Sequence, residues 1–155
     1  MISTISHVAI KTADLDGTIR FYTDVLGMEL KHRPPFAFPG AWVGTAEGGA
    51  IIHLYAGEPG LDAGGRPFVG SSAVDHFSCN ARGYAEYRRR FSERGLDWRE
   101  QAVPDTPLWQ LFVYDPNGVM VELVFDSREE DGPAPDMSSG RWYEPGVNFY
   151  GGAAN

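Results

Sequence analysis

An internal duplication is the feature that most restricts the fold of this chain. His53 lies 46 residues after His7, and Glu122 lies 46 residues after His76, so the second pair repeats the first. The surrounding text repeats as well, because the segment GAIIHL, which contains His53, aligns with GVMVEL, which contains Glu122. A repeat of this kind indicates two copies of one module of roughly 50 to 55 residues. Each copy places one potential metal ligand on its first strand and one on its last.

Each copy is expected to fold as a strand, a helix and three further strands. Period-two alternation predicts the strands, and apolar residues at helical spacing predict the helices. Asp14 or Asp16 can cap the first helix, and Gly27 ends it. The expected strands cover 4–11, 28–33, 41–46 and 50–55 in the first copy and 74–80, 97–102, 108–114 and 119–125 in the second, with helices at 14–27 and about 84–94.

The two copies are expected to form one domain over residues 1–126, followed by a tail. Module one covers about 4–57 and module two about 74–126. The tail, residues 127–155, begins with a polar, breaker-rich stretch but carries four aromatic residues in its last 14 positions: Trp142, Tyr143, Phe149 and Tyr150. Aromatic side chains at this density need cover, so the tail is expected to pack over the domain or onto a second subunit.

Charge and cysteine content limit the partners and the compartment. The chain has 13 basic and 21 acidic residues, a formal net charge of −8, which argues against nucleic acid or an anionic membrane as a partner. Cys79 is the only cysteine, so an intrachain disulfide is impossible and a reducing compartment is expected. With no apolar run approaching 18 residues and no leader pattern, we expect a soluble cytoplasmic protein.

Glu122 interrupts an otherwise apolar strand and therefore needs a partner. Strand alternation places it on one face with Met120 and Val124. A lone carboxylate among apolar neighbours is costly to bury unless a cation meets it. Two partners remain open at this point: an Arg or Lys across the sheet, or a metal ion.

The four repeated residues converge if the two modules pair around a common cleft. His7, His53, His76 and Glu122 would then supply imidazole and carboxylate donors, which suit Fe(II), Mn(II), Zn(II), Ni(II) or Co(II). A single His on a strand is more often a hydrogen-bonded structural residue than a ligand. Four such residues in register across a duplication favour a metal site, in which His53 is either a direct ligand or an acid/base.

Several aromatic residues are candidates for the wall of this site. Trp42 and Phe112 are interpreted as core or as substrate-binding wall, and Tyr55 shares the face of His53. Tyr114 ends its strand at the rim. Either phenol can donate a hydrogen bond to a substrate or simply stack in the core. The cluster Arg88–Arg90 is interpreted as a solvated helix face.

With these residues identified, the chain resembles the vicinal oxygen chelate superfamily. That superfamily includes glyoxalase I, extradiol dioxygenases, fosfomycin-resistance enzymes, methylmalonyl-CoA epimerase and bleomycin-binding proteins. The resemblance covers roughly residues 4–125 and is carried by HVAI at His7, FYTDVLG, His76 and DPNGVMVEL. It implies an α+β fold in which two paired βαβββ modules form a cupped, half-open barrel around a metal site. It further implies that His7, His76 and Glu122 are the metal ligands.

The resemblance favours an extradiol-type, ring-cleaving dioxygenase that acts on a small catecholic substrate. In such enzymes two His and one Glu hold Fe(II), and a further His near the end of the first module acts as acid/base, a role that His53 fits. Tyr114 lies near the position of their active-site Tyr. The alternative is a glyoxalase- or epimerase-like lyase or isomerase, in which His53 or Glu122 moves a proton on a metal-stabilised enediolate. A third possibility is a protein that binds a small molecule such as an antibiotic. The resemblance also implies a homodimer.

Overall fold

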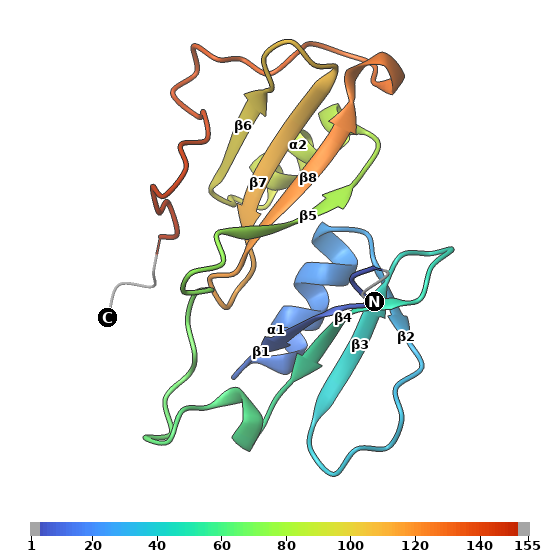
Figure 1. The fold of residues 1–155 in the computed structure, drawn as a ribbon, viewed down its shortest axis with the longest axis vertical. Coiled ribbons are helices and arrows are strands. Elements are labelled where there is room, and N and C mark those ends of the chain that lie inside the picture. The colour runs from blue at the N-terminus through green and yellow to red at the C-terminus, as the bar shows by residue number, and fades with distance from the viewer. Residues whose placement is uncertain (1–3, 152–155) are drawn as a thin grey trace. The chain divides into compact units, whose positions relative to one another are not determined.

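The computed structural model describes residues 4–151 of the chain. The chain divides into two compact units, residues 1–69 and 70–155. Each unit contains one sheet and one longer helix of its own (Figure 1). The boundary falls within the stretch that links the two sequence repeats.

Unit 1 is a four-stranded sheet with a helix on one face. Its strands run in the order β1-β4-β3-β2, with β1 parallel to β4 and the other neighbours antiparallel. The side chain of Asp14 accepts a hydrogen bond from the N–H of Gly17 at 2.9 Å and caps the helix, and Gly27 ends it with a φ of 73°. Its elements are β1 (Val8–Lys11), α1 (Leu15–Arg20), the π-helical turn η1 (Phe21–Val25), β2 (Glu29–Lys31), β3 (Gly40–Gly44), β4 (Ala50–Tyr55) and the 3-10 turn η2 (Glu58–Gly60).

Unit 2 repeats this plan strand for strand. Its order is β5-β8-β7-β6, with β5 parallel to β8. Its elements are β5 (His76–Asn80), α2 (Tyr84–Glu93), β6 (Trp98–Ala102), β7 (Leu108–Tyr114), β8 (Met120–Asp126) and the 3-10 turn η3 (Ser127–Glu129). The predicted α+β fold of two repeated βαβββ modules is therefore confirmed. The strands of the two units form two separate sheets, with no ladder between them among the described residues.

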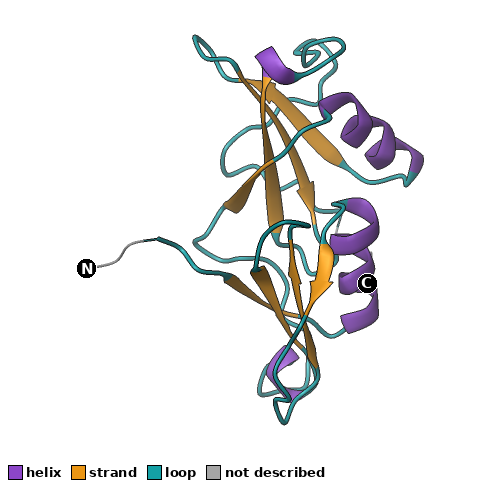
Figure 2. Cartoon of the chain, turned by 90° about the vertical axis from the view of Figure 1, so that its right-hand side faces the viewer, coloured by secondary structure: helices purple, strands orange, loops and turns teal. Residues whose placement is uncertain are grey.

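The helix of each unit covers one face of its own sheet (Figure 2). Apolar residues that alternate along the strands fill the space beneath each helix, such as Ile52 and Leu54 in unit 1 and Val121 and Phe125 in unit 2, each at most 1% exposed. Because successive side chains of a strand point to opposite faces, the residues between them lie on the helix-free face. This alternation places His53 and Glu122 there.

The strand boundaries differ from the expected ones mainly at the two first strands. The strand expected at 4–11 begins only at Val8, so His7 precedes it, and the strand expected at 74–80 begins at His76. Residues 4–7 are exposed and outside the ladder, with Ile5 84% exposed. Alternation alone predicted these extensions, but a strand ends where backbone partners end.

Arg88 is a correction to the expected solvated helix face. Its guanidinium Nε lies 3.3 Å from Oε2 of Glu100, a carboxylate that is fully buried beneath α2. The hydroxyl of Tyr84 donates a hydrogen bond to the same oxygen. Burial, followed by this bond to Glu100, raises the pKa of Tyr84 above its usual range. Arg88 is thus part of a buried polar network, whereas Arg89 pairs with glutamates on the helix surface.

The tail packs against unit 2. Its backbone runs parallel to β6: the N–H of Glu100 donates to the carbonyl of Arg141 at 2.7 Å, and the N–H of Tyr143 donates to that of Glu100 at 3.3 Å. Figure 1 shows this segment in red beside β6. The tail then continues to Phe149, which is 9% exposed and packs with Phe112 in one apolar cluster. The tail therefore contributes to the helix-free face of this sheet.

Candidate metal centre

Unit 1 brings two histidines and a tryptophan together on its helix-free face. The ring of His53 lies between two flat neighbours: His7, with ring centroids 3.9 Å apart, and Trp42, at 4.1 Å. His53 is 9% exposed. Burial lowers the pKa of His53, and the neighbouring His7 lowers it further. A neutral imidazole is the form that binds a metal or accepts a proton.

An aromatic surface extends from this pair along the same unit. Tyr55 meets Phe38 edge to face at 5.3 Å, and Phe36 contacts Trp42 at 6.2 Å. The guanidinium of Arg33 lies 4.9 Å and 5.0 Å from the ring centroids of Phe36 and Phe38, respectively. The two predicted wall residues, Trp42 and Tyr55, therefore lie on a continuous ring surface beside His53.

Unit 2 brings the second predicted pair into contact. Nε2 of His76 lies 3.2 Å from Oε2 of Glu122. Glu122 is 5% exposed, and its carboxylate accepts hydrogen bonds from the Ser78 hydroxyl at Oε2 and from the Gln110 amide at Oε1. Burial raises the pKa of Glu122, and the adjacent His76 opposes this effect. Within residues 4–151 no Arg or Lys pairs with Glu122, so the Arg or Lys partner considered from the sequence is not found, and the ion-pair partner of Glu122 is His76.

The imidazole of His76 lies between two carboxylates, those of Asp75 and Glu122. Nδ1 of His76 lies 2.7 Å from Oδ1 of Asp75. An ionised carboxylate can only accept, so Nδ1 donates its proton to Asp75, and Nε2 faces Glu122, to which a protonated ring donates its second N–H. A divalent metal ion bound here would take the place of that second proton between the imidazole and the carboxylate. A histidine that donates its other N–H to a carboxylate is the usual arrangement of a metal-bound imidazole.

The strand register makes the two pairs equivalent. In unit 1 the residue that pairs with His53 lies two positions after His7, and in unit 2 the residue that pairs with Glu122 lies two positions after His76. His53 is thus the counterpart of Glu122. In the part of the chain that the structure describes, no three His, Cys, Asp or Glu side chains gather at one point. The four predicted residues form two pairs, one in each unit.

The tail covers the two predicted site residues of β7. Tyr143 stacks flat on Phe112 with ring centroids 3.9 Å apart, which leaves Phe112 only 1% exposed. Tyr114 contacts Phe149 at 4.6 Å and Tyr150 at 5.3 Å. Burial raises the pKa of Tyr114. Phe112 and the tail residue Tyr143 therefore both border His76, with ring centroids 5.6 Å and 6.1 Å from the imidazole.

Four residues of this half-site were not among the sequence candidates: Asp75, Ser78, Gln110 and Tyr143. Ser78 and Gln110 lie on the same sheet face as Glu122, and each has apolar neighbours along its strand. A polar residue between apolar ones was therefore a sequence signal that could have identified both. For Asp75 the only sequence signal was its position next to His76. Tyr143 had only the aromatic density of the tail.

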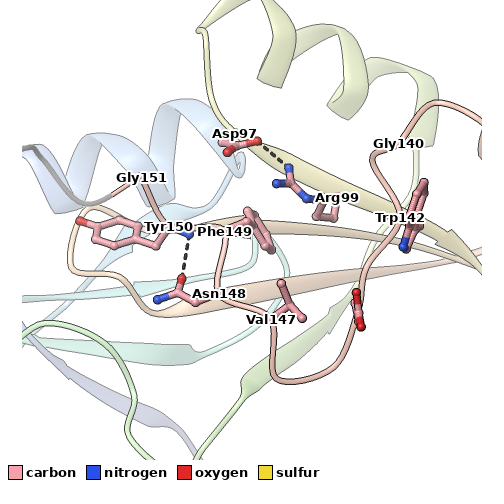
Figure 3. Close-up of a pocket in the computed structure, with 10 residues that line it drawn as sticks. Asp97, Arg99, Gly140, Trp142, Val147, Asn148, Phe149, Tyr150 and Gly151 are labelled. Carbon is pink, nitrogen blue, oxygen red and sulfur yellow. Dashed lines mark hydrogen bonds and ion pairs between the residues drawn. The ribbon is translucent and has the colours of Figure 1, made fainter.

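A cavity of about 430 Å³ lies between the tail and β6 (Figure 3). Arg99 borders it, donating to Asp97 at 2.6 Å and lying over the ring of Phe149 at 4.3 Å. None of the predicted site residues lines this cavity. A smaller cavity of about 280 Å³ is bordered by Asp75 and Tyr114, but neither His76 nor Glu122 lines it.

Comparison with known proteins gives consistent results. The family model described as Glyoxalase/Bleomycin resistance protein/Dioxygenase superfamily matches residues 4–123. A protein named Glyoxylase I 4 from Arabidopsis thaliana is 29% identical over 131 residues, 79% of this chain and 70% of that protein. The lactoylglutathione lyase of Salmonella typhimurium is 29% identical over 127 residues, 76% of this chain and 89% of that enzyme. The crystal structure of lactoylglutathione lyase from Agrobacterium tumefaciens matches with a TM-score of 0.58 and 24% identity, covering 82% of this chain and 96% of that one.

Proposed function

We propose that this chain, which belongs to the glyoxalase/bleomycin resistance protein/dioxygenase superfamily, is a metal-dependent lyase or isomerase. Its substrate would be a small molecule with two adjacent oxygen atoms. The observation that carries this proposal is the register equivalence of His53 and Glu122, which favours His53 as a fourth metal donor. Relatives named as glyoxylase and lactoylglutathione lyase support the same reaction class.

The donor set fits a divalent metal ion, which proteins of this superfamily generally bind. His7, His53 and His76 offer three imidazole nitrogens and Glu122 one carboxylate, a set suited to Fe(II), Mn(II), Ni(II), Co(II) or Zn(II). A bound ion of this kind supplies a Lewis acid that stabilises negative charge on a substrate oxygen. We propose that one pair from each unit completes the centre, within one chain or between the chains of a dimer.

The number of protein donors separates the lyase or isomerase from an oxygenase. An ion that takes six ligands and receives four from the protein keeps two positions, enough for two substrate oxygens. An oxygenase needs a further position for O₂. With His53 as a ligand, the site therefore suits proton transfer better than oxygen chemistry.

Glu122 is the residue best suited to move the proton. Its two carboxylate oxygens have different neighbours and could therefore serve different roles. Oε2, which faces His76, would be available to a metal ion, whereas Oε1, which accepts a hydrogen bond from the Gln110 amide, would accept a proton from the substrate carbon. The same oxygen then returns the proton to the neighbouring carbon. Gln110 and Ser78 hold the carboxylate in place throughout.

A ring-cleaving dioxygenase is the second candidate, and the packing of His53 favours it. Held between His7 and Trp42 with a lowered pKa, His53 is a neutral base at neutral pH even if it binds no metal. It would then accept a proton from a catecholic substrate beside Fe(II) held by His7, His76 and Glu122. Trp42 would supply the aromatic wall.

Metal content and oxygen uptake of single variants test the two candidates. Anaerobically purified wild type should hold close to one metal ion per site, and His76→Ala should lose it. The lyase or isomerase predicts that His53→Ala also loses metal and that catechols cause no O₂ uptake. The dioxygenase predicts retained metal with catechol-dependent O₂ uptake that falls in His53→Ala. His32→Ala, which changes the only other histidine, an exposed one, is the matched control. Wild type without metal would contradict both.

A further inference from the structure

We propose that Tyr143, in the C-terminal tail, is a positioning residue of the metal centre that acts through Asp75 on His76. This inference rests on the proposed function, because it takes His76 as a metal ligand. Tyr143 lies 67 residues after His76 and belongs to a segment beyond the duplicated modules. The tail would then be a working part of the site.

A continuous line of polar contacts connects the tail to the ligand pair. The hydroxyl of Tyr143 donates a hydrogen bond to Oδ1 of Asp75 at 2.5 Å. The same oxygen accepts from Nδ1 of His76 at 2.7 Å, and Nε2 of that ring lies 3.2 Å from Glu122. One oxygen of the Asp75 carboxylate thus accepts hydrogen bonds from both the phenol and the imidazole.

This contact matters because, apart from His76, the only other group that holds the Asp75 carboxylate among the described residues is the backbone N–H of Gly146, which also belongs to the tail. The side chain of Asp75 is 44% exposed at the beginning of β5, where a carboxylate can turn toward water. The phenol of Tyr143 fixes Asp75 in the position that holds the Nδ1–H of His76. The rings of Phe112 and Tyr143 meet the imidazole edge to face at 5.6 Å and 6.1 Å. The tail therefore restrains both the hydrogen bonding and the plane of the His76 ring.

The tail is anchored on both sides of Tyr143. Before it, the Glu100 N–H bonds to the Arg141 carbonyl and adds the tail to β6. After it, Phe149 is buried against Tyr114, and the Tyr150 hydroxyl donates to the carbonyl of Pro116 at 3.0 Å. These contacts lie away from the ligand pair, so they keep the tail in place whether or not His76 binds a metal. Because Tyr143 acts on His76 through Asp75, metal binding at His76 and docking of Tyr143 should favour each other.

Two tyrosines of the tail provide a matched test. Tyr143→Phe keeps the ring on Phe112 and removes only the hydroxyl bonded to Asp75, whereas Tyr150→Phe removes a tail hydroxyl bonded to Pro116. Co(II) affinity of the full chain is measured by competition with a chromophoric chelator. Tyr143→Phe should weaken binding by about 10-fold, within the range for an outer partner of a metal-bound histidine. Tyr150→Phe should leave the affinity unchanged. Asp75→Asn should weaken binding at least as much, and adding Tyr143→Phe to it should cost little more.

Hydrogen exchange of the tail provides a second readout. Saturating Co(II) should slow exchange at residues 141–150 in wild type and much less in Tyr143→Phe, while circular dichroism shows equal folding of both. If wild type binds Co(II) and both tyrosine variants bind equally well, the positioning role is wrong while the proposed function stands. Equal weakening by Tyr150→Phe would mean that the tail acts only by packing, which also overturns it. Wild type that binds no Co(II) removes the proposed function itself.

Discussion

The substitution Glu122→Gln should raise the melting temperature of the metal-free protein above that of wild type. In the presence of metal, the same variant should melt below wild type. In metal-free protein the carboxylate of Glu122 is 5% exposed, and burial raises its pKa, an effect that the adjacent His76 opposes only in part. A carboxyl whose folded pKa lies above its unfolded value, about 4.3, stabilises the protein only when protonated, and this contribution is lost as pH rises through the folded pKa. The glutamine amide introduced by this substitution carries no charge, so at pH 7.5 the metal-free variant should melt above wild type.

Metal should reverse that order by an amount that mass action sets. At a free metal concentration of 100 times the Kd, wild type gains about 2.7 kcal/mol. At about 2–4 °C per kcal/mol for a chain of this length, its Tm rises by about 5–11 °C. If loss of the carboxylate donor weakens binding by about 100-fold, the variant gains only about 0.4 kcal/mol at the same concentration. Its Tm then rises by about 1–2 °C.

Thermal melts at pH 7.5, in a chelator and in Co(II) or Zn(II), measure both halves of this prediction. Glu100→Gln is the control, because Glu100 is a second buried glutamate whose partners are Arg88 and Tyr84. It should lower the Tm equally with and without metal. The reasoning fails if Glu122→Gln gains as much from metal as wild type. It also fails if the metal-free variant melts below wild type at this pH.

Three further predictions concern the surroundings of the site. Glu100→Ala leaves the buried Tyr84 hydroxyl without its acceptor and Arg88 without its ion-pair partner, and it should cost about 1–3 kcal/mol, measured by denaturant unfolding; an unchanged stability would contradict the buried network. Trp42→Ala uncovers the ring of His53 and should raise its pKa toward the ordinary 6.5 in an NMR titration, whereas an unchanged pKa would show that Trp42 does not bury it. Removal of residues 141–155 should expose Phe112 and increase binding of a hydrophobic dye, and unchanged dye binding would argue against the docked tail.

The fold could be predicted because the same pattern of strands and helix occurs in both copies of the duplicated module. Apolar alternation around His53 and around Glu122 gives the same strand in both copies, and the register of the two sheets follows that repeat. Each predicted pair does meet: His7 with His53 as stacked rings, and His76 with Glu122 across 3.2 Å. These contacts could be predicted from the sheet face of each residue and from the order of the strands, because adjacent parallel strands bring equivalent positions together.

The supporting residues could not be predicted in the same way. Tyr143 reaches Asp75 from 68 positions along the chain, and no periodic pattern connects them. Glu100 lies in Arg-Glu-Gln, three polar residues in a row, so alternation does not show which of them is buried. Its burial depends on Tyr84 and Arg88, which approach from a separate helix. Contacts of this kind arise from packing between elements and leave no local signature.

Because the proposed donors fall into two pairs, one in each unit, metal binding can show whether the two pairs of a site come from one chain or from two. In the proposed four-donor centre one unit offers two of the donors, too few for a tight divalent site, so both units would contribute. His7→Ala disables unit 1 and Glu122→Ala disables unit 2, and each variant alone should therefore lose metal. If the pairs join between two chains, each mixed dimer contains one site of two built from intact units, and because half of the dimers in an equal mixture are mixed, the mixture should regain about a quarter of the wild-type metal. If the pairs join within one chain, every site in the mixture contains one altered unit, and metal stays lost. Unfolding and refolding the two variants together, followed by metal analysis, distinguishes the two arrangements, and binding by either single variant would refute the four-donor centre.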